Sequence, residues 1–117
     1  MTEKTAPAAA DTASEAIRDL NHLTRSPRDG FEYPGDAYST VAALSEMAAR
    51  LPQAIEQIAT FMKDLEAGGH LRSDKGTLAD DLQAVHDGLT VAAGAAHTLH
   101  GALDRAHQGL GPIAYQE

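Results

Sequence analysis

The sequence predicts an all-α protein, a long antiparallel helical hairpin preceded by a short helix. Apolar residues recur with heptad spacing through two segments of about thirty residues each. Alanine, the strongest helix former, dominates the apolar residues. Strand-like alternation is absent, and aromatic residues make up only 4% of the chain, so the core has to be aliphatic. These observations favour helices packed on helices.

The chain organisation follows from its caps and turns. Its 117 residues fit one small domain. We predict a disordered tail over 1–10, a single helical domain over 11–112 and a C-terminal tail over 113–117. The helices are expected over about 12–24, 36–67 and 77–110. Thr12 and Glu15 have the spacing of a capping box for the first helix, and turn-forming residues at 26–30 follow it.

The first long helix carries the clearest pattern. Asp36 is its expected N-cap, and Gly68-Gly69 marks its end. Its apolar residues form an unbroken heptad seam with 3-4-3-4-3-4-3 spacing: Val41, Leu44, Ala48, Leu51, Ile55, Ile58, Met62 and Leu65. Met47, Ala54 and Phe61 widen this seam. Pro52 removes a backbone donor while the heptad phase continues, so a kink is expected there.

The second long helix, with Thr77 as its expected cap, has a similar pattern. Its seam is Leu78, Leu82, Val85, Leu89, Ala92, Ala96, Leu99, Leu103, Ala106 and Leu110. A row of small residues recurs every seven positions beside it: Gly88, Ala95, Ala102 and Gly109. Since glycine inside a helix costs ~1 kcal/mol relative to alanine, the row indicates either a close approach of another backbone or a tolerant surface. An aspartate at Leu51 or Leu99 is expected to unfold the protein, because it would place a charge in a seam.

The apolar faces are wider than two helices can cover. At ~25 cal/mol per Å² of apolar surface, leaving them exposed forgoes several kcal/mol. We therefore expect a homodimer in which two hairpins form a four-helix bundle, with another protein as a second possible partner. The candidate contact residues are Met47, Phe61, Gly88, Ala95 and Ala102. An aromatic connector, Phe31, Tyr33 and Tyr38, either plugs one end of the bundle or anchors a partner.

Histidines are the main candidates for chemistry. His86, His100 and His107 share one heptad position at the border of the seam, and His97, His100 and Asp104 share a helix face. Solvated side chains, a metal site at His97, His100 and Asp104, and a pH-sensitive interface are all compatible with this pattern. Motifs of metalloproteases, di-metal bundles, serine hydrolases and phosphate-binding loops are absent. The sequence therefore predicts no enzyme and no cofactor, with a metal- or small-ligand-binding bundle as the alternative function.

Charge and cysteine content restrict the environment. The net charge of −8 disfavours nucleic acid, because a broad acidic field repels phosphates. No apolar run approaches the ~20 residues of a membrane span. The chain has no cysteine and no visible signal peptide, so a cytoplasmic location is expected.

One segment carries a family resemblance. The stretch from Phe31 to Tyr38, with Leu44 and the run Arg50-Leu51-Pro52-Gln53, resembles small uncharacterised actinobacterial proteins of plasmid or integrated-element type. The resemblance covers roughly residues 30–110 and implies an Ala-rich helical hairpin in a bacterial cytoplasm, with no activity attached. Secreted hairpins of the WXG100 type are a further alternative. Their Trp-x-Gly turn is missing here, since this turn reads Ala67-Gly68-Gly69.

Overall fold

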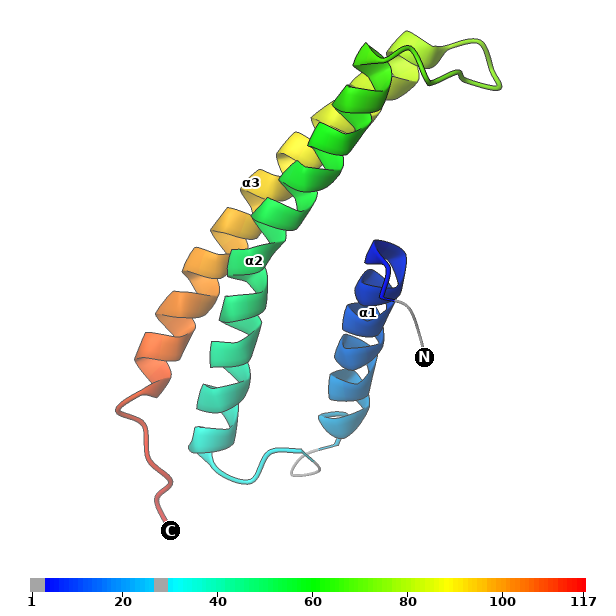
Figure 1. Ribbon diagram of the computed structural model, residues 1–117. Coiled ribbons are helices and arrows are strands. Elements are labelled where there is room, and N and C mark those ends of the chain that lie inside the picture. Colours follow the sequence, from blue (N-terminus) through cyan, green and yellow to red (C-terminus); the bar gives the residue numbers. More distant parts are fainter. Residues whose placement is uncertain (1–3, 27–29) are drawn as a thin grey trace.

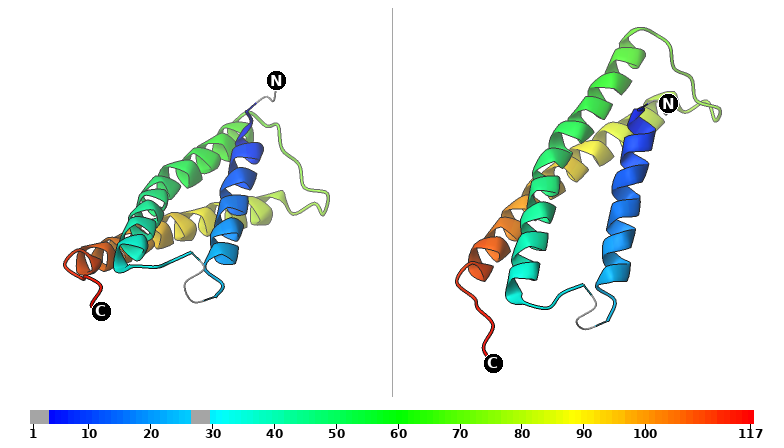
Figure 2. Two further views of the ribbon diagram at one scale, coloured as in Figure 1. Left: turned by 90° about the horizontal axis from the view of Figure 1, so that it is seen from below. Right: turned by 60° about the horizontal axis from the view of Figure 1, so that its bottom comes forward.

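A computed structural model describes residues 4–26 and 30–117, which form three helices and no strand. These are α1 (Ala6–Leu23), α2 (Pro34–Ala67) and α3 (Leu78–Leu110) (Figure 1). Helices α2 and α3 pack as a long antiparallel hairpin. Helix α1 runs beside the N-terminal half of α2, but no Cα atom of α1 comes within 8 Å of α2 or α3 (Figures 1 and 2). The all-α class and the hairpin are thus confirmed.

Helix α1 begins six residues earlier than predicted. Its N-cap is Thr5, whose Oγ1 accepts a hydrogen bond from the backbone N–H of Ala8 (3.2 Å). The prediction of a disordered tail is therefore wrong for residues 6–10, where alanines surround a proline in the first turn, a position that proline tolerates. Thr12 lies inside the helix, and its hydroxyl donates to the carbonyl of Ala8 (3.0 Å). Residues 1–3 of the predicted tail and 27–29 of the predicted turn lie outside the described residues.

Helix α2 also begins before its predicted cap. Tyr33 is the N-cap and Pro34 the first helical residue, so Asp36 is the third residue of the helix and the predicted N-cap was wrong. The Asp36 carboxylate nevertheless serves the helix start, because its Oδ2 accepts the backbone N–H groups of Tyr33 (3.0 Å) and Glu32 (2.8 Å). These two hydrogen bonds hold the pKa of Asp36 below its ordinary value of 3.8. The sequence identified the correct carboxylate but the wrong capping position.

The ends of α2 and α3 near the hairpin loop have clear local causes. At the end of α2, Gly69 has φ 70°, its N–H donates to the carbonyl of Glu66, and the N–H of His70 donates to the carbonyl of Leu65. This is a Schellman motif, which needs a left-handed residue after the cap. Helix α3 starts after Thr77 as predicted, but the Thr77 hydroxyl donates to Asp81 (3.1 Å) and makes no bond to a backbone N–H.

Two glycines should respond in opposite ways to replacement by alanine. Gly69→Ala should lower the free energy of unfolding by about 1–2 kcal/mol, because an L side chain is strained at its positive φ. Gly94→Ala should raise it by about 1 kcal/mol, because Gly94 is interior to α3 and an added Cβ meets no atom within 4 Å. Urea unfolding followed by circular dichroism measures both. Equal effects at the two positions would contradict the assigned loop geometry.

The chain is unusually extended for its size. The Cα radius of gyration is 19.1 Å, whereas a compact domain of this length has about 13 Å. The accessible surface is 9023 Å², compared with about 6,100 Å² for a folded monomer of this mass. The buried core is narrow and built from small and medium residues along one line of contact: Ser45, Ala48, Pro52, Leu82, Ala93 and Ala96. Much apolar surface therefore stays outside it.

Candidate interaction surface

The contact between α2 and α3 is rotated relative to the predicted seams. We call the observed contact rows the inner seam. On α2 the inner seam is Val41, Ser45, Ala48, Pro52, Ile55, Ala59 and Met62. On α3 it is Leu82, His86, Leu89, Ala93, Ala96, His100, Leu103, His107 and Leu110. On each helix, every second residue of the predicted seam also belongs to the inner seam. Each of the other predicted residues is replaced by the residue that follows it in the sequence.

The rotation has a packing reason. The residues that replace Leu44, Leu51 and Ile58 on α2 are Ser45, Pro52 and Ala59, which are smaller. On α3, Ala93 takes the place of Ala92, and Ala96 lies one helical turn further on, buried in the seam. Small residues along a contact let two helix backbones approach closely, so the narrower side of α2 faces α3. On α3 the rotation instead brings His86 and His100 into the contact in place of Val85 and Leu99. The bulky aliphatic residues move to the flank.

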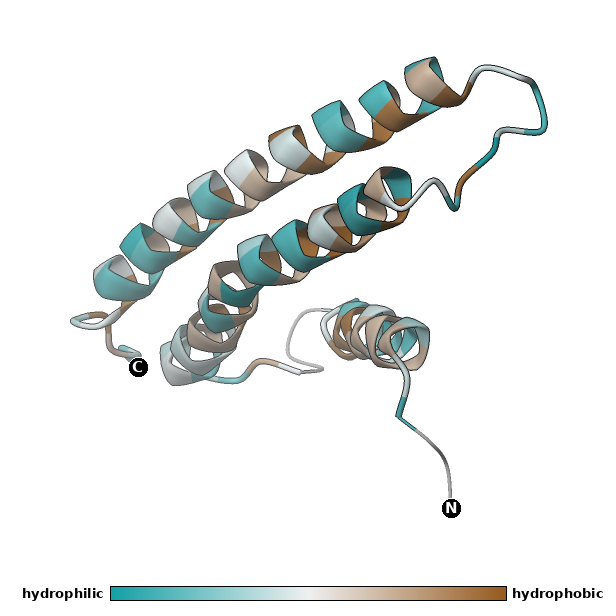
Figure 3. Cartoon of the chain, turned by 45° about the horizontal axis from the view of Figure 1, so that its top comes forward, coloured by the Kyte–Doolittle hydropathy of each residue, from teal (hydrophilic) through white to brown (hydrophobic). Residues whose placement is uncertain are grey.

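The displaced residues form a second heptad row on each helix, which we call the outer seam. On α2 it is Thr40, Leu44, Met47, Leu51, Ala54, Ile58, Phe61 and Leu65, spaced 4-3-4-3-4-3-4. On α3 it is Val85, Gly88, Ala92, Ala95, Leu99, Ala102, Ala106 and Gly109, spaced 3-4-3-4-3-4-3. Hydrophobic residues accordingly recur along both long helices (Figure 3). Each long helix therefore carries two adjacent apolar stripes.

Both outer seams lie on the same side of the hairpin. In each helix, the bulky outer row precedes an inner row by one residue, and the two helices run in opposite directions. Viewed from one end of the hairpin, the residues of one helix advance clockwise and those of the other advance anticlockwise. A shift by one residue toward the N-terminus therefore moves both rows toward the same side of the hairpin. The outer seams together therefore make one continuous apolar face.

Much of this apolar face is exposed to solvent. Ile58 is 52% exposed, Phe61 59% and Leu99 44%, and Val85 is also among the exposed large hydrophobic residues. The opposite side of the hairpin is mostly polar: Ala42, Ala49, Glu56, Lys63, Gln83, Thr90, His97 and Asp104. The contrast between the two sides marks the apolar face as the candidate functional surface.

Predicted contact residues fall into two groups in the structure. Met47, Phe61, Gly88, Ala95 and Ala102 lie in the outer seams, and the structure therefore brings them to one face. The aromatic connector lies at the end of the hairpin instead. The Tyr38 ring stacks on His107, with centroids 4.2 Å apart, and the Tyr33 ring meets Tyr115 edge to face at 5.4 Å. Phe31 is half-buried. Tyr38 thus packs against α3 at the open end of the hairpin.

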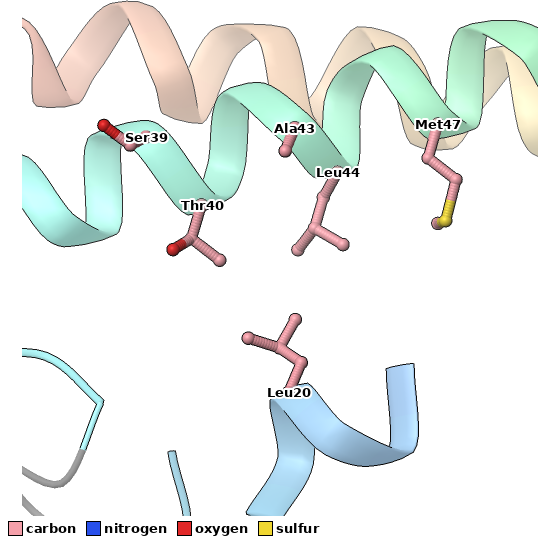
Figure 4. A pocket seen from close by; sticks show the side chains of 6 residues that line it. All are labelled: Leu20, Ser39, Thr40, Ala43, Leu44 and Met47. Carbon is pink, nitrogen blue, oxygen red and sulfur yellow. The ribbon is translucent and has the colours of Figure 1, made fainter. Parts of the chain in front are cut away.

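An open cavity separates α1 from the apolar face. Its volume is about 420 Å³, and its lining is largely apolar: Leu20, Ser39, Thr40, Ala43, Leu44 and Met47. Figure 4 shows Leu20 of α1 pointing across the gap toward Thr40 and Leu44 of α2. Ile17, Leu20 and Thr24 are the half-buried residues of the segment 4–26, so α1 shields only this part of the face.

Three histidines lie in the inner seam, whereas the sequence predicted them at the border of the seam. Nδ1 of His100 lies 3.0 Å from the carbonyl oxygen of Ser45 and 3.1 Å from its Oγ. A carbonyl can only accept, so this contact fits the tautomer in which Nδ1 is the donor. His86 Nε2 lies 3.3 Å from Glu66 Oε1, and its buried Nδ1 has no hydrogen-bond partner among the described residues. Each of these histidines, with His107 on Tyr38, therefore links α3 to a specific residue of α2.

The predicted metal ligands do not come together. His100 is turned toward Ser45 in the seam, whereas His97 lies exposed on the polar side. Among residues 4–26 and 30–117, no three histidine, aspartate or glutamate side chains are grouped closely enough to hold a metal ion. The i, i+3, i+7 spacing of His97, His100 and Asp104 put the three on one helix face, but the contact with α2 divides that face.

Comparison of the chain with protein-family models, with curated proteins and with solved structures finds no match. Among the described residues, no helix has both the length and the apolar character that a membrane span requires.

Proposed function

We propose that this protein is a non-enzymatic helical interaction module that associates with itself through the apolar face. The observation that carries the proposal is the second heptad row on each long helix. An amphipathic helix in a stable monomer buries one apolar stripe, whereas α2 and α3 each present a further stripe to solvent. Heptad spacing is the pattern that packs helix against helix, so the fitting occupant is another pair of helices.

The surface area supports a second copy as the occupant. The chain exposes about 2,900 Å² more than a compact monomer of its mass would. Obligate homodimers bury about 2,000–5,000 Å² in total over both partners. This excess, which includes the surface of the separate helix α1, is as large as the area that such an interface buries. Two hairpins stacked on their apolar faces would form a four-helix bundle with the polar sides facing outward.

Sedimentation equilibrium over micromolar concentrations tests the proposal. The unmodified chain should fit a monomer–dimer equilibrium dominated by the dimer. Ile58→Glu should shift it toward monomer by at least 100-fold in Kd, because a carboxylate would be buried at the centre of the contact without a partner.

Gln57→Glu is the matched control, since it introduces a glutamate at the neighbouring position, outside both seams. It should dimerise like the unmodified chain, apart from a small effect of charge. A strictly monomeric unmodified protein, or equal effects of the two variants, would remove the proposal.

A further inference from the structure

We infer that α1 docks on the outer seam of α2 and so completes a three-helix bundle within one chain. The docked helix covers the α2 part of the apolar face and competes with a second copy for it. The docking itself does not depend on self-association, whereas the competition rests on the function proposed above. The cavity that separates α1 from α2 closes when α1 docks.

Helix α1 carries a heptad row along its whole length. Its half-buried residues Ile17, Leu20 and Thr24 are spaced 3-4, and the same alternation continues through three alanines toward the N-terminus. The complete row, which ends at the C-cap Thr24, is spaced 4-3-4-3-4: Ala6, Ala10, Ala13, Ile17, Leu20 and Thr24. The charged residues of α1 all lie outside it: Asp11, Glu15, Arg18 and Asp19. Docking by this row therefore buries no charge.

The position of α1 beside α2 sets the register. The two helices run antiparallel (Figures 1 and 2), and Leu20 points toward Thr40 and Leu44 (Figure 4). Read in opposite directions from Thr24 and from Thr40, the row of α1 and the outer seam of α2 have the same spacing, 4-3-4-3-4. Pairing Leu20 with Leu44 therefore matches the two rows without a gap: Thr24 with Thr40, Ile17 with Met47, Ala13 with Leu51, Ala10 with Ala54 and Ala6 with Ile58.

The paired residues suit each other in size and in polarity. Bulky residues of α2 meet alanines of α1, so the two helix backbones can approach closely: Leu51 meets Ala13, and Ile58 meets Ala6. The threonine pair at the other end has its donors satisfied already. The Thr24 hydroxyl donates to the carbonyl of Leu20 (2.8 Å), and the Thr40 hydroxyl donates to the carbonyl of Asp36 (2.8 Å). Both side chains can therefore be buried without losing a hydrogen bond.

The space between the helices favours the inward movement. It is an open cavity of about 420 Å³ with a largely apolar lining, where water finds few hydrogen-bond partners and the lining lacks packing contacts. Packed helices have axes about 8–10 Å apart, whereas every Cα atom of α1 lies more than 8 Å from those of α2. Since the direction and the level of α1 already fit, docking requires only that the distance become shorter.

Docking of α1 removes a surface that self-association needs. The row covers the outer seam of α2 from Thr40 to Ile58, and only Phe61 and Leu65 of that seam lie beyond it. A second copy can bind these covered residues only in chains whose α1 is undocked. The apparent Kd is the intrinsic Kd divided by the fraction of competent chains, so docking of α1 weakens self-association.

Two cysteines in one chain test the docking, because the chain has none of its own. Ala13→Cys with Leu51→Cys should form an intrachain disulfide under mild oxidation. A disulfide needs Cα atoms within about 7 Å, so it forms only if α1 moves closer than the present distance of more than 8 Å. Ala8→Cys with Leu51→Cys is the matched control, because Ala8 is also exposed on α1 but lies about 140° around the helix from Ala13. The control pair should cross-link about 10-fold more slowly or not at all.

The same disulfide measures the competition. The oxidised chain, in which α1 is fixed on α2, should have a Kd of self-association about 10-fold higher than the same chain after reduction. Ala13→Glu should have the opposite effect and lower the Kd, because a carboxylate cannot be buried against Leu51 and α1 stays undocked. Ala8→Glu adds the same charge on the other side of α1 and should leave the Kd unchanged. Sedimentation equilibrium measures all four chains.

The outcomes separate the docking from self-association. A dimer by sedimentation whose Ala13→Cys and Leu51→Cys pair cross-links no faster than the control pair overturns the docking and leaves the proposed function intact. A disulfide that joins two chains also overturns it, because α1 then lies on α2 of the partner copy. Equal Kd values for the oxidised and reduced chains overturn the competition. A chain that forms the intrachain disulfide but stays monomeric, even as Ala13→Glu, removes the proposed function while the docking stands.

Discussion

Replacing Ala48 with aspartate should unfold the hairpin. Ala48 is 0% exposed and lies in the inner seam of α2, and Ala96 in the inner seam of α3 is 6% exposed. An ionised carboxylate placed there has no room and no partner, and removing such a charge from water costs several kcal/mol. Because the whole stability of a small domain is about 5–15 kcal/mol, this one change removes much of it. The midpoint of thermal unfolding by circular dichroism should fall by tens of degrees, or the folded signal should be lost.

Ala49→Asp provides a close control for this substitution. Ala49 is the next residue in α2, but it is exposed on the polar side of the hairpin. The same side chain there remains hydrated, and surface substitutions usually change the free energy of unfolding by less than about 0.5 kcal/mol. Similar melting of the two variants would mean that the inner seam does not run through Ala48.

Heptad spacing was sufficient to predict the hairpin. It predicted two long helices packed on each other, and the caps and glycines predicted the positions of their ends to within two residues. Pro52 was correctly placed inside an unbroken helix, and α2 changes direction near its middle (Figure 1). These features follow from local rules, since periodicity, glycine and proline act within a few residues of themselves.

The rotation of the seams was not predicted. When a helix carries apolar residues at three or four positions of each heptad, several pairs of rows have heptad spacing, and hydrophobicity alone selects the bulkiest pair. On α2 the structure selects the smaller residues Ser45, Pro52 and Ala59 instead, because close backbone approach depends on size as well as on polarity. The choice also involves His100, whose hydrogen bond to Ser45 joins residues 55 positions apart in the sequence. A contact of this kind cannot be derived from the pattern of either helix alone.

The face that remains after the rotation could be predicted only in part. Met47, Phe61 and the small residues of α3 were identified as candidates because they lay beside the predicted seams. Leu51 was instead assigned to the seam, and the structure places it in the outer row, where it is half-buried. Only the end of helix α1 was predicted correctly, and its separation from the hairpin depends on three-dimensional distances that the sequence pattern does not contain.

The second large effect is expected at Leu99, and it reverses the expectation from the sequence. If Leu99 lay between α2 and α3, as the sequence predicted, Leu99→Asp would unfold the protein. In the structure Leu99 is 44% exposed and belongs to the outer seam, so an aspartate there remains hydrated in the single chain. The hairpin should keep its helical signal, whereas the dimer should weaken by at least 100-fold in Kd, because the new charge would be buried between the two copies. Light scattering over a concentration series and circular dichroism on the same samples separate the two effects.

Val91→Asp tests whether position or charge causes this effect. Val91 lies on the same helix but is 71% exposed and outside both seams, so the same kind of substitution should leave both the fold and the association unchanged. If Val91→Asp also dissociated the dimer, repulsion between chains of net charge −8 would be the cause, and raising the salt concentration would restore the dimer. Leu99→Asp could instead unfold the chain, as Ala48→Asp should. Leu99 would then face α2 of the same chain, and α3 would have no outer seam. Loss of association in a chain that remains folded is therefore the result that assigns the two heptad rows of α3 to two different contacts.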